Sequence, residues 1–279
     1  MPELPEVETI ARGLRRHGVP GLAVARVRVL WPRTVDGLSP VEFSRQLAGR
    51  TIEAVGRRAK YLVFTLSGGL YLLVHLRMTG RFQLAEEGSP AVPGLRLEVA
   101  LEDGRALRFF DSRKFARWRL TAEPGLILDR LGPEPLEKRF SGTAFFSRLQ
   151  QHRRQIKPLL LDQAFLAGVG NIYADEALWR AGINPQRLAP SLTREEALCL
   201  YEAIRHVLRQ GIRNSGTSLG RGRPNFLGVT GQPGRNQDTL KVFRRTGSPC
   251  PRCGRPIRRL VVAQRGTHIC PACQPAPRV

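Results

Sequence analysis

Residues 250–273 read CPRCGRPIRRLVVAQRGTHICPAC, near the end of a chain of 279 residues. The stretch holds two Cys-x2-Cys pairs, Cys250 with Cys253 and Cys270 with Cys273, and sixteen residues separate the pairs. This spacing is typical of a zinc site made of four thiolates. Four sulfur ligands leave a zinc ion no open coordination position, so we predict one structural zinc ion.

The sequence between the pairs predicts a small β-ribbon. Residues 260–262 are Leu-Val-Val, and Gly254 and Gly266 allow tight turns. A metal can hold such a ribbon rigid where no large core exists. Four independent thiols are the alternative, which the matched spacing disfavours. The fifth cysteine, Cys199, is interpreted as a buried small apolar residue of a helix.

Charge points to a polyanionic partner. Lysine and arginine total 45 against 23 acidic residues, a formal net charge of +22. No basic helix with a large apolar face stands out, so nucleic acid is favoured over a membrane surface. The ribbon carries its own set of arginines, which favour a role as a DNA clamp: Arg252, Arg255, Arg258, Arg259 and Arg265.

Neither a signal peptide nor an apolar run long enough to span a bilayer is found in the sequence. We therefore expect a cytoplasmic protein without a membrane partner. We also expect the protein to act as a monomer.

Two regions with different periodicity make up the rest of the chain. Residues 61–66 and 70–74, and residues 95–99 and 106–109, predict β-hairpins, so residues 50–120 are expected to form a β-sandwich or barrel. The pattern is helical after residues 131–136, which read LGPEPL. Helices are expected at 158–167, at 171–180, and from a capping box at Thr193 and Glu196 onwards. Residues 214–239 are expected to be a mobile loop.

The start of the chain, Met1-Pro2-Glu3, has the chemistry of a covalent catalyst. Pro at position two favours removal of Met1, which would expose a prolyl amine. A secondary amine attacks an aldehyde carbon and forms an iminium, an electron sink for bond cleavage. A helix expected from Pro5 would favour the uncharged amine through its positive end. A frayed terminus, with Glu3 and Glu6 complementing the helix dipole, is the alternative.

A second candidate lies at residues 168–171, which read GVGN. Two helices joined through these glycines can present backbone amides to a phosphate, with Asn171 as a further donor. An ordinary helix hairpin with glycine caps explains the segment equally well.

Five segments together resemble formamidopyrimidine-DNA glycosylase, a bacterial repair enzyme for oxidised purines. They are residues 2–9 (PELPEVET), 58–62 (RAKYL), 131–136 (LGPEPL), 162–176 (DQAFLAGVGNIYADE) and 263–267 (AQRGT). Leu4 also matches this family. The related endonuclease VIII, which prefers oxidised pyrimidines, usually has glycine at that position, so the chain resembles it less well.

The resemblance implies four catalytic residues. Pro2 would attack the sugar C1′ to form a Schiff base, and Glu3 would serve as a general acid and base. Lys60 would contact the phosphate backbone and assist catalysis. Arg265 would hold a phosphate and assist the second elimination.

The resemblance also implies DNA contacts. Met78, Arg113 and Phe115 match the side chains that fill the gap left by a flipped nucleotide, although core packing is the ordinary role for Met78 and Phe115. The remaining candidates for DNA binding are Glu6, Arg153, Lys157 and Asn171.

Some positions depart from the family pattern. Arg77 replaces a usual glycine, residues 111–116 read DSRKFA instead of DPRRFG, and no histidine occurs at 90–97. Arg235 and Asn236 replace an aromatic pair. The last change lies near the loop that the resemblance implies closes over the extruded base, so it bears on which damaged base is removed more than on the reaction type.

The implied fold is α+β and multidomain. We expect an N-terminal helix and β-sandwich at 1–130, a linker at 131–140, a helix-two-turn-helix domain with its loop at 141–239, and a zinc ribbon at 240–279. The implied function is base-excision repair of damaged double-stranded DNA, followed by cleavage of the abasic site, with the DNA in a basic cleft. A non-enzymatic DNA-binding protein and a ribosome-associated zinc-ribbon protein are the alternatives.

Overall fold

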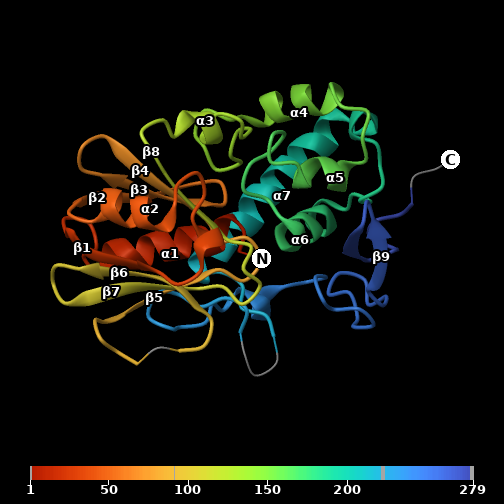
Figure 1. Ribbon diagram of the computed structural model, residues 1–279. Helices are drawn as coiled ribbons and strands as arrows, with labels where there is room; N and C mark the ends of the chain where they lie inside the picture. The colour runs from red at the N-terminus through yellow and green to blue at the C-terminus, as the bar shows by residue number, and fades with distance from the viewer. Residues whose placement is uncertain (1, 91, 221–223, 277–279) are drawn as a thin grey trace. The chain divides into compact units, whose positions relative to one another are not determined.

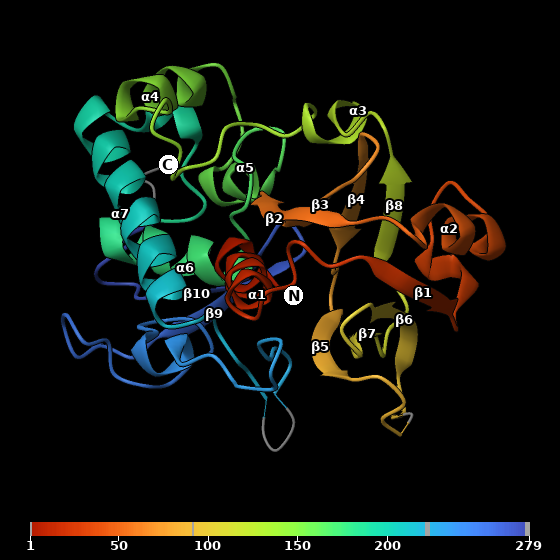
Figure 2. The same cartoon turned by 90° about the vertical axis from the view of Figure 1, so that its left-hand side faces the viewer.

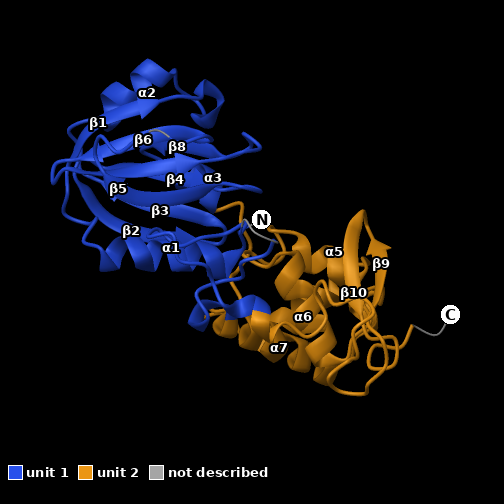
Figure 3. Ribbon diagram, turned by 90° about the horizontal axis from the view of Figure 1, so that it is seen from below, with its two compact units in different colours: residues 1–128, 211–237 blue, residues 129–210, 238–279 orange. Residues whose placement is uncertain are grey.

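The computed structural model describes residues 2–90, 92–220 and 224–276 (Figure 1). The chain forms two compact units (Figure 3). Unit 1 comprises residues 1–128 and 211–237, and unit 2 comprises residues 129–210 and 238–279. Among the helices that the structure describes, none combines the length and apolar character needed to cross a bilayer.

Unit 1 is a β-sandwich with helices beside it, and Figure 2 shows the sheets as separate layers. One antiparallel sheet has the order β1-β6-β7-β5, formed by Val24–Val29, Leu95–Leu101, Arg105–Phe110 and Arg81–Glu86. The other has the order β2-β3-β4-β8, formed by Ile52–Arg58, Tyr61–Leu66, Leu70–His75 and Arg117–Thr121. The helices are α1 (Leu4–Arg16), α2 (Pro40–Leu47) and α3 (Gly125–Leu128).

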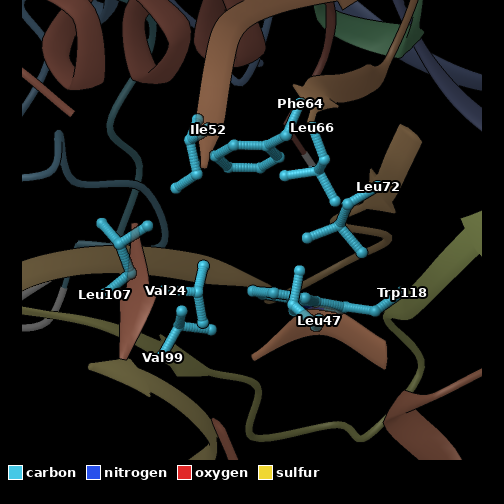
Figure 4. A pocket seen from close by; sticks show the side chains of 9 residues that line it. All are labelled: Val24, Leu47, Ile52, Phe64, Leu66, Leu72, Val99, Leu107 and Trp118. Atoms are coloured by element: carbon cyan, nitrogen blue, oxygen red, sulfur yellow. The ribbon is translucent and has the colours of Figure 1, made fainter. Parts of the chain in front are cut away.

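Alternating side chains build the core between the two sheets. In β3, Leu62, Phe64 and Leu66 are buried while their neighbours are partly exposed, the pattern of a strand with one covered face. Phe82, Phe109 and Trp118 pack with ring centroids 5.2–5.3 Å apart. Apolar side chains converge on the interior (Figure 4), where the open space is only about 10 Å³. The sandwich is therefore a packed core with no room for a ligand.

Helix α1 docks on the sandwich through one apolar face and two polar contacts. Val7, Ile10 and Leu14 recur at helical spacing and are fully buried. The Glu8 carboxylate lies 3.2 Å from Arg57 Nε of β2, and the Arg15 guanidinium donates to the Val55 carbonyl at 2.7 Å. The chain start is thus tied to strand β2.

Unit 2 combines helices with a β-ribbon. The helices are α4 (Gly142–Gln150), α5 (Ile156–Leu161), α6 (Asn171–Ala181) and α7 (Arg194–Arg213), the last of which ends in unit 1. The ribbon consists of β9 (Arg258–Val262) and β10 (Arg265–Ile269), which pair antiparallel. The sandwich, the helical region and the ribbon that the sequence predicts are therefore confirmed.

Of two local predictions in unit 2, the capping box is confirmed and the bounds of one helix are wrong. The capping box is confirmed, because the Thr193 amide donates to Glu196 Oε2 at 2.9 Å and the Glu196 amide donates to Thr193 Oγ1 at 3.2 Å. The helix expected at 158–167 is wrong. The helix begins at Ile156 and ends at Leu161, with Asp162 as its C-terminal cap. The Asp162 carboxylate accepts from the Ala164 amide in a turn, so the chain leaves the helix there.

Cys199 is exposed, which contradicts its interpretation as a buried residue. Ala197 and Tyr201 are buried on the apolar stripe of α7. Cys199 lies two residues from each, and successive helix residues are rotated by about 100°. Its side chain therefore points away from that stripe.

The described parts of segment 211–237 are anchored in unit 1. Phe226 and Val229 belong to the hydrophobic core of the sandwich. The Arg235 amide donates to the Asn214 carbonyl at 2.8 Å, and the Ser218 hydroxyl donates to the Phe226 carbonyl at 2.6 Å. The Thr217 amide donates to the Glu6 carboxylate of α1 at 2.7 Å, so the segment lies against α1.

Candidate active site and nucleic-acid interface

The start of the chain is buried and held in one geometry. Pro2 and Glu3 are both buried. The carboxylate of Glu6, only 1% exposed, accepts from the Glu3 amide at 2.8 Å and from the Thr217 amide at 2.7 Å. Glu6 therefore joins the beginning of α1 to a segment more than 200 residues away. It also satisfies a backbone donor that the first turn of a helix leaves open.

A second layer of side chains supports this contact. Asn236 Nδ2 donates to Thr217 Oγ1 at 2.9 Å, and Asn214 Nδ2 donates to Asn236 Oδ1 at 3.2 Å. Asn236 is 3% exposed. In the sequence, Asn236 stands out only as a departure from an aromatic residue of the family pattern. Nothing in its local pattern indicates that it would support Glu6.

Lys60 lies in the turn between β2 and β3 and is 5% exposed. Arg57 holds this turn, since its guanidinium donates to the Ala59 carbonyl at 3.0 Å and also pairs with Glu8 of α1. Burial, aided by the charges of Arg77 and Lys60, lowers the pKa of His75 to about 3. His75 is thus neutral near pH 7, and its Nδ1 accepts from the Arg77 amide at 3.0 Å.

Left-handed backbone recurs beside the predicted site residues. Seven described residues other than glycine have positive φ, and four of them adjoin a predicted site residue: Ala59, Arg77, Lys114 and Gln264. Such conformations cost about 1–3 kcal/mol each and persist where the surroundings impose them. The sharp turns that present Lys60, Met78, Phe115 and Arg265 are therefore held by their neighbours.

Asp111 holds together the two loops that carry Met78 and Arg113. Its carboxylate accepts from the Thr79 hydroxyl and, at 2.8 Å, from the Ala116 amide. Thr79 Oγ1 in turn accepts from the Arg113 amide at 3.1 Å. Asp111 is 1% exposed, so both loops are fixed from beneath.

The outer faces of these loops remain open to solvent. Met78 is 36% exposed and Phe115 is 49% exposed, although both are large and apolar. The Arg113 guanidinium lies 4.9 Å from the Phe115 ring centroid, and Lys114 Nζ lies 3.9 Å from the Trp31 ring centroid. Exposed apolar side chains on a rigid support are suited to insertion between bases.

Lys157 is fully buried in unit 2 and serves as an internal cation. Its Nζ lies 2.6 Å from Asp175 Oδ1, and it donates to Thr267 Oγ1 at 2.7 Å and to the Gly266 carbonyl at 3.1 Å. Asp175 Oδ2 accepts from the His268 amide at 2.9 Å. This arrangement argues against a direct phosphate contact by Lys157. It fixes strand β10, which begins with Arg265.

Asn171 and the start of α6 lie beside the same strand. Asn171 Nδ2 donates to the Gly266 carbonyl at 3.0 Å, and no side chain caps the helix. Gln163 shapes the preceding loop, because it accepts from the Gly168 amide at 2.9 Å and donates to the Val169 carbonyl at 3.0 Å. In the part of the chain that the structure describes, Asn171 Oδ1 is buried without a hydrogen-bond partner.

Arg265 is exposed at the tip of the ribbon. Ala263 and Gln264 connect the strands with φ values of 45° and 62°, as a two-residue hairpin turn requires. Arg153, in the segment between α4 and α5, is also exposed. The structure therefore brings Lys157, Asn171 and the Arg265 strand together and leaves Arg153 separate from their hydrogen bonds.

The four cysteines form a closed metal site. Their sulfur atoms all lie within 4.8 Å of one another, with Cys250 and Cys273 at 3.9 Å and Cys253 and Cys270 at 3.4 Å. A tetrahedron with Zn–S bonds of about 2.3 Å needs S–S distances of about 3.8 Å. The cysteines therefore fit one structural zinc ion.

Neighbouring donors stabilise the thiolate at Cys250. Burial opposes ionisation, but hydrogen bonds from the Arg252 amide and the Trp179 indole, each at 3.4 Å, lower the pKa of Cys250 to about 6. These bonds also orient the sulfur as a ligand.

A second buried carboxylate ties the ribbon side of unit 2 to α6. Glu176 accepts from three successive amides, those of Lys241, Val242 and Phe243, at 2.9–3.0 Å. Burial raises the pKa of Glu176 despite these donors.

Three family descriptions match the chain in order. The formamidopyrimidine-DNA glycosylase N-terminal domain matches residues 1–118, and the H2TH domain of that glycosylase matches residues 131–221. A zinc finger found in FPG and IleRS matches residues 247–276, which include all four cysteines.

Relatives and solved structures agree over nearly the full length. Formamidopyrimidine-DNA glycosylase of Herpetosiphon aurantiacus is 50% identical, covering 98% of this chain and 100% of its own. The Fpg (MutM) of Lactococcus lactis, solved with DNA containing N7-benzyl-Fapy-dG, has a TM-score of 0.90 at 35% identity, covering 99% and 100%. The MutM (Fpg) protein of Thermus thermophilus has a TM-score of 0.88 at 44% identity, with the same coverage.

Substitution Asp111→Asn is expected to loosen both loops of the Met78 and Arg113 region. It replaces a charged acceptor, whose hydrogen bonds are worth about 1.5–3 kcal/mol. We expect amide hydrogen exchange at Arg113 and Ala116 to become about tenfold faster or more. Asp103→Asn, in an exposed hairpin turn, is the matched control and should leave these amides unchanged. Unchanged exchange in Asp111→Asn would contradict a supporting role for Asp111.

Elemental analysis should give one zinc ion per chain, and Cys253→Ser should release it. Without the metal, the ribbon lacks a core large enough to stay folded. We expect the β9 and β10 amides to lose protection from hydrogen exchange while the sandwich keeps its own. Cys199→Ser, at the exposed fifth cysteine, is the control and should retain the metal. Active protein without metal, or with these cysteines in disulfides, would refute the assignment.

Proposed function

The chain belongs to the formamidopyrimidine-DNA glycosylase family, and on this premise we propose its substrate and the course of its reaction. It is a base-excision repair glycosylase that acts on damaged DNA. The proposed substrates are 8-oxoguanine and formamidopyrimidines in duplex DNA. The proposed second step is cleavage of the abasic site by β- and δ-elimination. The enzyme is proposed to act as a monomer in the bacterial cytoplasm, at the nucleoid.

Pro2 is the proposed nucleophile. After removal of Met1, its secondary amine attacks the sugar C1′ as the damaged base leaves, and the ring-opened sugar becomes an iminium. Loss of a C2′ proton then breaks the C3′–O bond and expels the 3′ phosphate. In the second elimination, loss of the C4′ proton breaks the C5′–O bond and expels the 5′ phosphate. The position of Pro2 just before α1 supports this role, because the positive end of the helix favours the uncharged amine.

Glu3 is the proposed general acid and base. It is buried beside the nucleophile, and the Glu6 carboxylate holds its backbone. The observation that carries the proposal is this fixed start of the chain, with Pro2 and Glu3 buried and Glu6 bonded to Thr217. A carboxyl group in a fixed position can protonate the leaving base and later accept a proton from the sugar.

Phosphate binding is proposed for Lys60, Arg265, Asn171 and the start of α6. The uncapped helix terminus offers backbone donors, and Asn171 lies beside the strand of Arg265. Lys157 is proposed to position that strand rather than to touch DNA, because its Nζ is buried and already bonded. Arg153 and the net charge of +22 add a general attraction for the backbone.

Met78, Arg113 and Phe115 are proposed to fill the space left by the extruded nucleotide. Extrusion costs a few kcal/mol of stacking and pairing, and an apolar wedge with a guanidinium offsets part of that cost. The exposed side chains of Met78 and Phe115, on loops fixed through Asp111, support this role.

Trapping with borohydride tests Pro2. Borohydride added during reaction with an 8-oxoguanine duplex should reduce the iminium and leave a covalent protein–DNA adduct on the N-terminal peptide. A short tag ahead of Pro2 should abolish the adduct, because the amine becomes an amide. The same tag at the C-terminus is the control. An adduct on Lys60 would overturn Pro2 as the nucleophile, and no adduct at all would favour a non-enzymatic DNA-binding protein.

Substitution Glu3→Gln tests acid–base catalysis, because glutamine keeps the shape but cannot transfer the proton. Excision of 8-oxoguanine should slow by about 10²–10⁴, the usual value of general acid–base help. Cleavage of a preformed abasic site should slow less. Equal losses in the two single-turnover rates would mean that Glu3 is structural.

A further inference from the structure

Unit 1 contains a concave site that the proposed reaction does not use. It is a pocket of about 600 Å³ between α1, the last residues of α7 and the turn at 228–235. Five basic side chains line it: Arg12, Arg16, His17, Arg213 and Arg235. No acidic side chain is among its described lining residues, and neither are Pro2, Glu3 or Lys60.

The charge in this pocket is largely unneutralised. Arg12 pairs with Glu8, with 2.8 Å between Nε and Oε1. Arg16, Arg213 and Arg235 are exposed, and the described residues offer them no ion pair. Guanidinium groups gathered around one hollow repel one another and raise the local potential. An anion in the hollow would relieve that repulsion.

Close packing and backbone hydrogen bonds fix the walls of this pocket. Gly13 lets the turn approach α1 closely, since a Cβ atom there would lie 2.8 Å from Val229. The Leu84 amide of β5 donates to the Val229 carbonyl at 2.8 Å, and the Gly228 amide donates to the Gln232 carbonyl at 2.8 Å. Arg235 is held through its own amide by Asn214. A preformed hollow loses little conformational entropy when a ligand enters.

We propose that this pocket is a binding site for clustered phosphate groups. Planar guanidinium groups recognise phosphate oxygens in pairs, and several of them converge here. A volume of about 600 Å³ is that of a site for a small molecule such as a nucleotide. The phosphates can come from a free anion or from a DNA backbone away from the lesion.

The test compares two double variants by calorimetry at one low ionic strength. The pocket variant is Arg16→Ala with Arg235→Ala. Its matched control is Arg33→Ala with Arg45→Ala, two exposed arginines of unit 1 outside the pocket. Pyrophosphate and an undamaged 12-base-pair duplex are the two probes. Each variant loses the same charge, so a general electrostatic effect is equal in both.

The pocket variant should bind pyrophosphate at least about tenfold more weakly than the control does, because it loses two of the guanidinium groups that would bind the phosphate oxygens. If only the duplex discriminates between the variants, the phosphates are those of DNA, and the site is still supported. Equal affinities of the two variants for both probes would overturn the proposal. Neither probe requires base excision, so this outcome is independent of the proposed reaction.

Discussion

A buried carboxylate needs hydrogen-bond donors or a cation, and this requirement determines where the functional residues of both units lie. In unit 1, Glu6 accepts from Glu3 and Thr217, so the chain start has one position. Asp111 does the same for the loops of Met78 and Arg113. In unit 2, Asp175 holds Lys157 and His268, and with them the strand of Arg265. Each carboxylate is satisfied only when distant segments meet.

Three of the residues proposed to touch DNA share a different environment. Met78, Phe115 and Arg265 are exposed on tight turns with left-handed backbone, while their supports are buried. This division between exposed side chains and buried supports has a physical reason. A wedge or a phosphate ligand must be accessible, yet it loses less entropy on binding if its backbone is already fixed. Strain at Ala59, Arg77 and Lys114 is offset by the bonds that hold these turns.

The departures from the family pattern acquire physical roles in the structure. Arg77 has a φ of 53°, which explains why glycine is usual there, and its amide binds the neutral His75. Asn236 supports Thr217 beneath the chain start, a bond that an aromatic side chain could not make. Arg235 adds charge to the pocket beside α1. These replacements concern the surroundings of the site rather than Pro2, Glu3 or Lys60.

The sequence alone determined the local features whose cause lies within a few residues. The Cys-x2-Cys pairs predict the zinc ribbon, alternating residues predict the hairpins of β3 and β4, and Thr193 with Glu196 predicts the start of α7. Only the tertiary structure decided the burial of Lys157 and the support of Glu6 by residues near 217 and 236. Those outcomes depend on which segments pack together, and a partner 200 residues away leaves no periodic signal in the local sequence.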